Sequence, residues 1–209
     1  GFRLTVSNPA DFMWLADTVA VLDITAAKQQ PLDSILGVRG VVSTAPGVLG
    51  DAFYLQDAAG NGLRIYVNGG APALHVGQVV QAYGMLVDYQ GELELVVNAE
   101  NQVFAAAVGD APVARVVRTG RLRQADAGSL VQVNGRIARI AENTLTLNDG
   151  SGSVRIFFGA QSGGMPARLR VGLPFTAIGV VGYVSAGGAA VPGVRLTVRT
   201  AGDFYLTPR

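Results

Sequence analysis

The stretch Phe53–Val67, FYLQDAAGNGLRIYV, recurs in outline at Leu145–Phe158 as LTLNDGSGSVRIFF. Each copy alternates apolar and polar residues, reaches an aspartate and a glycine-rich turn, and then alternates again. Alternation with a period of two, interrupted by a short turn, is typical of a β-hairpin. The chain is therefore predicted to be a tandem repeat with one such hairpin in each copy.

Successive side chains of a strand point to opposite faces, so each hairpin has an inner and an outer side. The apolar positions, expected inside, are Phe53, Leu55, Leu63, Ile65 and Val67 in the first copy and Leu145, Leu147, Val154, Ile156 and Phe158 in the second. The outer positions are Tyr54, Gln56, Arg64 and Tyr66 in the first copy and Thr144, Thr146, Asn148, Arg155 and Phe157 in the second. Both copies thus place an arginine and an aromatic two residues apart on one outer face, which suits base stacking beside a phosphate chain.

The composition indicates an all-β fold. The 209 residues are 49% hydrophobic and include 28 glycines and 9 prolines, without a sustained helical pattern of apolar residues. This favours many short strands and tight turns, and the repeat favours two domains of about 90 residues. No apolar run reaches the roughly 18 residues that cross a bilayer, and no signal-peptide layout opens the chain, so no membrane partner is expected. The absence of cysteine excludes disulfides and leaves the compartment open.

The net charge of +1 conceals two oppositely charged halves. Through Pro112, four basic residues stand against eleven acidic ones, a net charge of −7. From Val113 onward, twelve basic residues stand against four acidic ones, a net charge of +8. This asymmetry favours an anionic partner for the second half or attraction between an acidic and a basic module. A charged surface that serves solubility alone is the other interpretation.

Further strands align between the two copies at a constant offset of 95 residues. LGVRGVV at Leu36–Val42 matches LVQVNGRI at Leu130–Ile137, and the offset returns after loops of unequal length, at Gly84 and Gly179. Fifth strands are expected at Glu92–Val97 and Val194–Val198. Because glycine within a strand usually marks a bulge or bend, Gly40 and Gly135 are predicted to be structural corners. Five strands with such corners describe a small closed barrel.

The segments outside the strands set the predicted domain limits. Residues 2–15 resemble residues 194–206, so residues 1–22 are expected to form the tail strand of a preceding repeat or a linker arm, with Trp14 as a packing anchor. A short helix is expected at Ala26–Gln30 with Thr25 as its N-cap. The first barrel then covers residues 23–110 and the second residues 111–209, with the division near Ala107–Pro112.

The pattern VRGVV (38–42), FYLQDAAGNGLRIYV (53–67) and LHVGQVVQAYGMLVDYQGELEL (74–95) resembles the OB-fold repeats of bacterial exported or surface proteins, which often stand beside nuclease-type or phosphoesterase domains. The resemblance covers Asp23–Leu206. It implies two OB-like barrels, adjoining domains in the same polypeptide and a secreted or cell-surface location. It also implies a binding surface on the outer face of the second and third strands, which holds Tyr54, Gln56, Arg64 and Tyr66 in the first barrel and Thr146, Arg155 and Phe157 in the second. The first barrel is acidic and poor in lysine, which would also suit a purely structural role.

Other candidate chemistry is sparse. The single histidine, His75, is expected to pack at the entry of a strand, and no cysteine or second histidine exists to complete a zinc site. Asp57 and Asp149 are predicted to bond turn amides, and Glu92 and Glu94 to protect an exposed strand from edge pairing. No glycine-rich phosphate loop or nucleophile elbow is present. A non-catalytic module without metal or cofactor is therefore expected.

Two functions from different classes remain open. In the first, the module binds single-stranded nucleic acid: Arg39, Arg64, Arg136 and Arg155 contact phosphates, while Tyr66 and Phe157, together with Tyr54, offer rings to bases. In the second, it is a structural spacer or protein-interaction module without nucleic-acid activity. Sugar binding is a third, more distant alternative, since OB barrels serve several ligand classes. A continuous basic stripe across Arg136, Arg155 and Phe157 would favour nucleic acid, and scattered arginines would favour the spacer.

Overall fold

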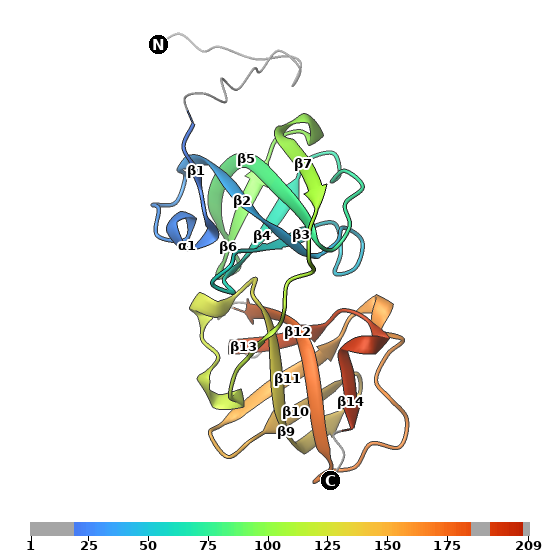
Figure 1. Ribbon diagram of the computed structural model, residues 1–209. Helices are drawn as coiled ribbons and strands as arrows, with labels where there is room; N and C mark the ends of the chain where they lie inside the picture. The colour runs from blue at the N-terminus through green and yellow to red at the C-terminus, as the bar shows by residue number, and fades with distance from the viewer. Residues whose placement is uncertain (1–18, 185–192, 207–209) are drawn as a thin grey trace.

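The computed structural model describes residues 19–184 and 193–206. These residues form two β-barrels that follow one another in the sequence and are in contact (Figure 1). Barrel one contains β1 (Val21–Leu22), α1 (Ile24–Ala27), β2 (Ile35–Thr44), β3 (Phe53–Gln56), β4 (Gly62–Val67), β5 (Gln78–Tyr89), β6 (Glu92–Val97) and β7 (Val103–Val108). Barrel two contains β8 (Arg115–Val116), β9 (Leu130–Ala141), β10 (Thr144–Asn148), β11 (Ser153–Phe158), β12 (Pro174–Val184), β13 (Gly193–Val198) and β14 (Phe204–Leu206). The all-β, two-barrel prediction is confirmed. The predicted tail segment with Trp14 lies outside the described residues.

The strand order is the same in both barrels. In barrel one it runs β2-β3-β4-β6-β5 and closes by pairing of β5 with β2; in barrel two it runs β9-β10-β11-β13-β12 and closes through β12 and β9. The third and fifth strands are parallel neighbours in each barrel, and the other barrel pairs are antiparallel. A closed five-stranded barrel with this order is OB-like. The hydrogen-bonded register repeats at the 95-residue offset, as Val38 opposite Ala82 and Val133 opposite Ala177 show.

Each barrel carries two additional strands that the sequence did not predict. β1 and β8 run parallel to β2 and β9, while β7 and β14 run antiparallel to β5 and β12. The 95-residue offset holds here too, because Val21 pairs with Gly37 as Val116 pairs with Gln132. The repeat unit is therefore a seven-stranded element.

The inner hairpin residues fill the two cores, as their alternation predicted. Phe53, Leu55 and Ile65 are fully buried in barrel one, and Leu147 and Ile156 in barrel two. Full burial of such a side chain stabilises the fold by about 1.5–3 kcal/mol relative to exposure.

Helix α1 covers part of the first core but begins earlier than predicted. Its N-cap is Asp23 rather than Thr25, because the Asp23 carboxylate accepts a hydrogen bond from the amide of Ala26 at 2.7 Å. The Thr25 amide and hydroxyl instead donate to Asp57, at 3.0 and 2.8 Å. Asp57 also accepts the turn amide of Asn61, so its predicted role in the hairpin turn is confirmed.

The strand irregularities lie three residues beyond the glycines that were expected to mark them. The register shifts at Ser43 in β2 and at Ala138 in β9, positions that are again 95 residues apart. Gly40 and Gly135 are instead points of close approach: an added Cβ would lie 3.0 Å from the Leu55 Cβ and from the Asn148 carbonyl carbon, respectively. The bulges therefore set the strand direction, and these glycines make room for the opposing strand.

The two barrels meet through backbone at Gly62 and Gly128. A Cβ on Gly62 would lie 2.0 Å from the Gly128 carbonyl oxygen, and Gly128 adopts a φ of +86°, which favours glycine. At this point the Gly62 amide donates to the buried Ser129 hydroxyl at 2.9 Å. A separate contact is made by the Arg199 guanidinium of barrel two, which donates to the Ser43 carbonyl of barrel one. This close approach fixes which face of barrel one is covered.

Candidate nucleic-acid interface

The predicted binding face of barrel one lies largely inside the inter-barrel interface. Tyr54 and Gln56 retain only 8% and 3% of their exposure. The Gln56 side-chain amide forms hydrogen bonds with the backbone of the second half. Its nitrogen donates to the Val113 carbonyl at 3.3 Å, and its oxygen accepts a hydrogen bond from the Leu130 amide at 3.0 Å. Gln56 thus links the two barrels, and this part of the face offers little open surface to a nucleic-acid strand.

Arg64 and Tyr66, the other predicted residues of this face, are half-buried. Arg64 forms an ion pair with the buried Glu94 of the neighbouring strand β6, and its guanidinium carbon lies 4.6 Å from the centroid of the Tyr89 ring. The charge of Arg64 is thus already balanced within barrel one.

Glu92 and Glu94 do not protect an edge, as the sequence had suggested. Strand β6 lies between β4 and β5, so it has no open edge, and both carboxylates are buried. Glu92 accepts a hydrogen bond from the Tyr183 amide of barrel two at 2.6 Å, and burial raises the pKa of Glu92. Both glutamates therefore act inside the molecule.

The outer face of barrel two presents arginines on three of its strands. The pairing register places Arg139 of β9 beside Thr146 of β10, Thr146 beside Arg155 of β11, and Arg155 beside Arg195 of β13. Arg139 is exposed, and Arg155 and Arg195 are half-buried. We call Arg139, Arg155 and Arg195 the arginine row.

Phe157 lies beside the arginine row, two residues along β11 from Arg155. The guanidinium carbons of Arg155 and Arg195 lie 5.8 and 5.7 Å from the centroid of its ring. Contacts at this distance are cation–π interactions, which favour a positively charged group near the ring face. The half-buried ring is thus placed beside two cationic side chains, the combination predicted for stacking bases beside phosphates.

One position in the fifth strand distinguishes the two barrels. Arg195 pairs with Arg155 in barrel two, and the equivalent residue of barrel one, Glu94, pairs with Arg64. The same position in the repeat therefore holds an acidic residue in barrel one and a basic residue in barrel two.

A polar hollow of about 440 Å³ adjoins the arginine row. It is lined by side chains from the β10–β11 hairpin and from the segment before β9, including Arg123, Thr146, Ser151, Ser153 and Arg155. Hydroxyl and guanidinium groups of this kind are typical donors to phosphate oxygens.

Sequence reasoning missed Arg123, Arg139 and Arg195. Strict alternation from Arg136 assigns Arg139 to the opposite face, and only the bulge at Ala138 brings it beside Thr146. Arg195 was placed on a predicted strand, but its neighbour could be known only from the OB strand order, in which the fifth strand lies beside the third.

The remaining predicted residues lie away from the centre of this surface. Arg136 is exposed in the middle of β9, opposite Asn148 at the end of β10, and it donates to the Gly172 carbonyl at 2.9 Å. Arg39 is exposed on β2 of barrel one and shares a hollow with Asp23 and Asp57, so its surroundings are acidic. Arg136 thus extends the basic surface of barrel two, and Arg39 does not join it.

The prediction for Asp149 is confirmed by the structure, and the prediction for His75 is not. Asp149 accepts hydrogen bonds from the Ser151 amide and hydroxyl and from the Thr119 hydroxyl, and these bonds, that of the Ser151 hydroxyl above all, lower its pKa. Its predicted role as a turn residue is confirmed. His75 is exposed, so the prediction that it packs at a strand entry is wrong.

The described residues contain no group of three or more His, Cys, Asp or Glu side chains placed to hold a metal ion. Nor does any helix within them have the length and apolar character needed to cross a membrane.

Comparison with known proteins yields structural likeness only. No protein-family model matches the chain, and no curated protein matches it. Among solved structures, a replication protein A heterotrimer bound to ssDNA is 8% identical over 97% of this chain and 72% of its own, with a TM-score of 0.34. The tetrameric p202 HIN2 structure is 10% identical over 84% of this chain and 95% of its own, with a TM-score of 0.35. Likeness at this level does not bear on function, which is inferred from the chain's own residues.

Proposed function

We propose that the chain is a non-catalytic module that binds single-stranded nucleic acid through the outer face of barrel two. The observation that carries this is the arginine row with Phe157 beside it. Arg155 and Arg195 lie opposite one another on the parallel neighbours β11 and β13, and Thr146 and Arg139 continue the row. The guanidinium groups would donate to the phosphates of a bound strand, and the Phe157 ring would stack a base.

The proposed binding is weak and sensitive to salt. Neutralisation of phosphates supplies the sequence-independent part of the affinity, and stacking adds about 1–3 kcal/mol per base. Because only one ring is offered, the stacking contribution is small, and the entropy lost when the bound strand is ordered opposes binding. Adjoining domains in the same polypeptide would make such binding useful by raising the effective concentration of the nucleic acid. The secreted or surface location implied by the resemblance stays a prediction.

One observation favours the alternative, a structural spacer or protein-interaction module. The face of barrel one that corresponds to the proposed site is used to hold barrel two, through Gln56 and Glu92. A module built only to keep two barrels in a fixed arrangement would need this interface and no ligand.

Fluorescence anisotropy with a labelled single-stranded oligonucleotide at several salt concentrations separates the two functions. We expect Arg155→Ala to weaken binding and to reduce the salt slope by about 0.7, the value for one phosphate contact on a single strand. We expect Phe157→Ala to cost about 1–3 kcal/mol with the slope nearly unchanged, because it removes stacking.

Arg39→Ala and Tyr66→Ala are the matched controls in barrel one, and both should bind as the wild type does. Arg64→Ala is a poor control because it leaves the Glu94 carboxylate buried without its cation. Absence of binding at low salt, or equal losses in all four variants, would support the spacer.

A further inference from the structure

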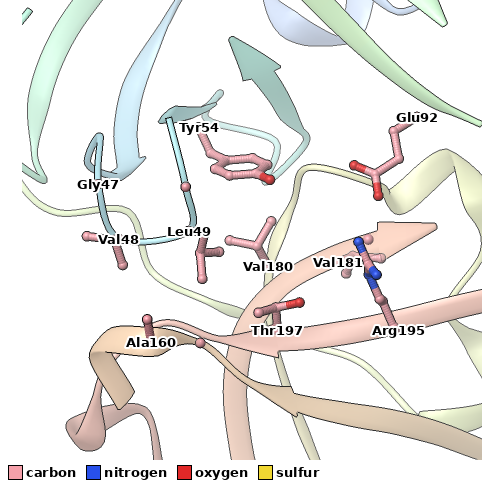
Figure 2. A pocket seen from close by; sticks show the side chains of 13 residues that line it. Gly47, Val48, Leu49, Tyr54, Glu92, Ala160, Val180, Val181, Arg195 and Thr197 are labelled. Carbon is pink, nitrogen blue, oxygen red and sulfur yellow. The ribbon is translucent and has the colours of Figure 1, made fainter. Parts of the chain in front are cut away.

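A cavity of about 420 Å³ lies between the two barrels, and we call it the inter-barrel cavity. Leu49 of the loop after β2, Tyr54 and Glu92 line it from barrel one, and Val180 and Arg195 line it from barrel two. In Figure 2 Leu49 and Val180 lie beside the Tyr54 ring, and Glu92 and Arg195 lie at the other end. The cavity thus combines an aromatic and aliphatic part with a polar end, as small-molecule sites commonly do.

The polar end offers both an acceptor and a donor. Glu92 and Arg195 point toward one another in Figure 2, and Gly182 makes room for both: its added Cβ would lie 2.9 Å from the Arg195 Nε and 3.0 Å from the Glu92 Oε1. The Arg195 Nε is buried and has no hydrogen-bond partner in the part of the chain that the structure describes. A base edge that carries both acceptors and donors would complement the guanidinium and the carboxylate at this end of the cavity.

We propose that the inter-barrel cavity binds a nucleobase and receives the base at one end of the strand bound on barrel two. This inference rests on the proposed function, because Arg195 belongs both to the cavity and to the arginine row. A strand that follows Arg155 and Phe157 toward Arg195 arrives at the cavity mouth. The Tyr54 ring and Val180 suit the flat faces of a base, and its polar edge meets Glu92 and Arg195.

Guanine complements the polar end of the cavity better than uracil or an isolated phosphate does. Its O6 and N7 are the acceptors that arginine recognises most often, and its N1–H and N2–H groups are donors for a carboxylate. Uracil offers a carboxylate only one N–H group. An isolated phosphate fits poorly, because the Glu92 carboxylate would face it across the same space.

Titration with guanosine 5′-monophosphate (GMP) and uridine 5′-monophosphate (UMP), followed by NMR chemical shifts, tests the proposal. A base held by its ring and edge should bind with a Kd on the order of a millimolar. We expect GMP to bind at least about fivefold more tightly than UMP, and Leu49→Trp, which fills the cavity, to abolish both. Glu92→Gln keeps an acceptor for the Tyr183 amide and should weaken GMP about tenfold with little effect on UMP.

Arg139→Ala, which lies outside the cavity lining, distinguishes the cavity from the outer face. It should weaken oligonucleotide binding and leave GMP binding within twofold of the wild type. GMP binding that is absent, or unchanged in both Leu49→Trp and Glu92→Gln, would overturn the cavity proposal. GMP binding retained without any oligonucleotide binding would overturn the proposed function instead.

Discussion

Lys28 joins the two barrels through its ammonium group. Its Nζ donates to three carbonyl oxygens, those of Gly62 in barrel one at 2.9 Å and of Ala125 and Ala127 in barrel two at 2.9 and 2.7 Å. Burial lowers the pKa of Lys28 from 10.5 to about 8, although the nearby carboxylates of Asp126, Asp57 and Glu92 oppose the shift. Lys28 thus links the two barrels and also changes its protonation state at moderately alkaline pH.

The lowered pKa predicts how stability changes with pH. Between pH 8 and 10.5 the unfolded chain keeps a proton on Lys28 that the folded chain has lost, so the free energy of unfolding rises with pH. The contribution of Lys28 deprotonation to the free energy of unfolding is on the order of 3 kcal/mol. It is complete above pH 10.5 and is lost as the pH falls through 8. Urea unfolding of the wild type and of Lys28→Met should show their difference growing in favour of the wild type from pH 8 to 10.5. A difference that is flat or shrinks over this range would contradict the assignment.

The start of β4 packs against the segment before β9 without room for any side chain. We expect Gly62→Ala to destabilise the protein by about 1–3 kcal/mol, because the new Cβ overpacks against the Gly128 carbonyl. Gly109→Ala is the matched control: its Cβ would lie 3.7 Å from the Gly77 carbonyl oxygen, an ordinary contact. Denaturant unfolding measures both, and equal stability of the two variants would show that the barrels can separate at Gly62 without cost.

Much of each strand could be predicted from the sequence, and its surroundings could not. Alternation assigned Leu55 and Leu147 to the cores, because the inner face of a barrel must be apolar. Alternation also placed Tyr54 and Gln56 outside, which is true of barrel one alone, but the second barrel covers them. That covering depends on a close approach between Gly62 and Gly128, which are distant in sequence and carry no pattern.

The candidate site was predicted only in part, because contacts between segments distant in sequence leave no pattern in it. Arg155 and Phe157 follow from the hairpin itself, whereas Arg139 and Arg195 depend on a bulge and on a parallel neighbour. A bulge at Ala138, which is neither glycine nor proline, leaves no signal that alternation can detect.

At the scale of the whole molecule, the two barrels share one architecture and differ in the use of one face. In barrel one this face carries the balanced pair Arg64 and Glu94 and lies against barrel two. In barrel two it carries the arginine row. The acidic half, with a net charge of −7, would repel a polyanion, and the basic half, with +8, would attract it. We therefore interpret barrel one as the support and barrel two as the binding element.

NMR chemical-shift mapping with a single-stranded oligonucleotide at low salt tests this division of roles most directly. We predict that the amides of Thr146, Arg155, Phe157 and Arg195 shift on titration, and that those of Arg39 and Tyr66 in barrel one do not. The shifts should diminish together as salt is added, because phosphate contacts supply most of the affinity. Shifts centred on barrel one, or no shifts at low salt, would contradict the account.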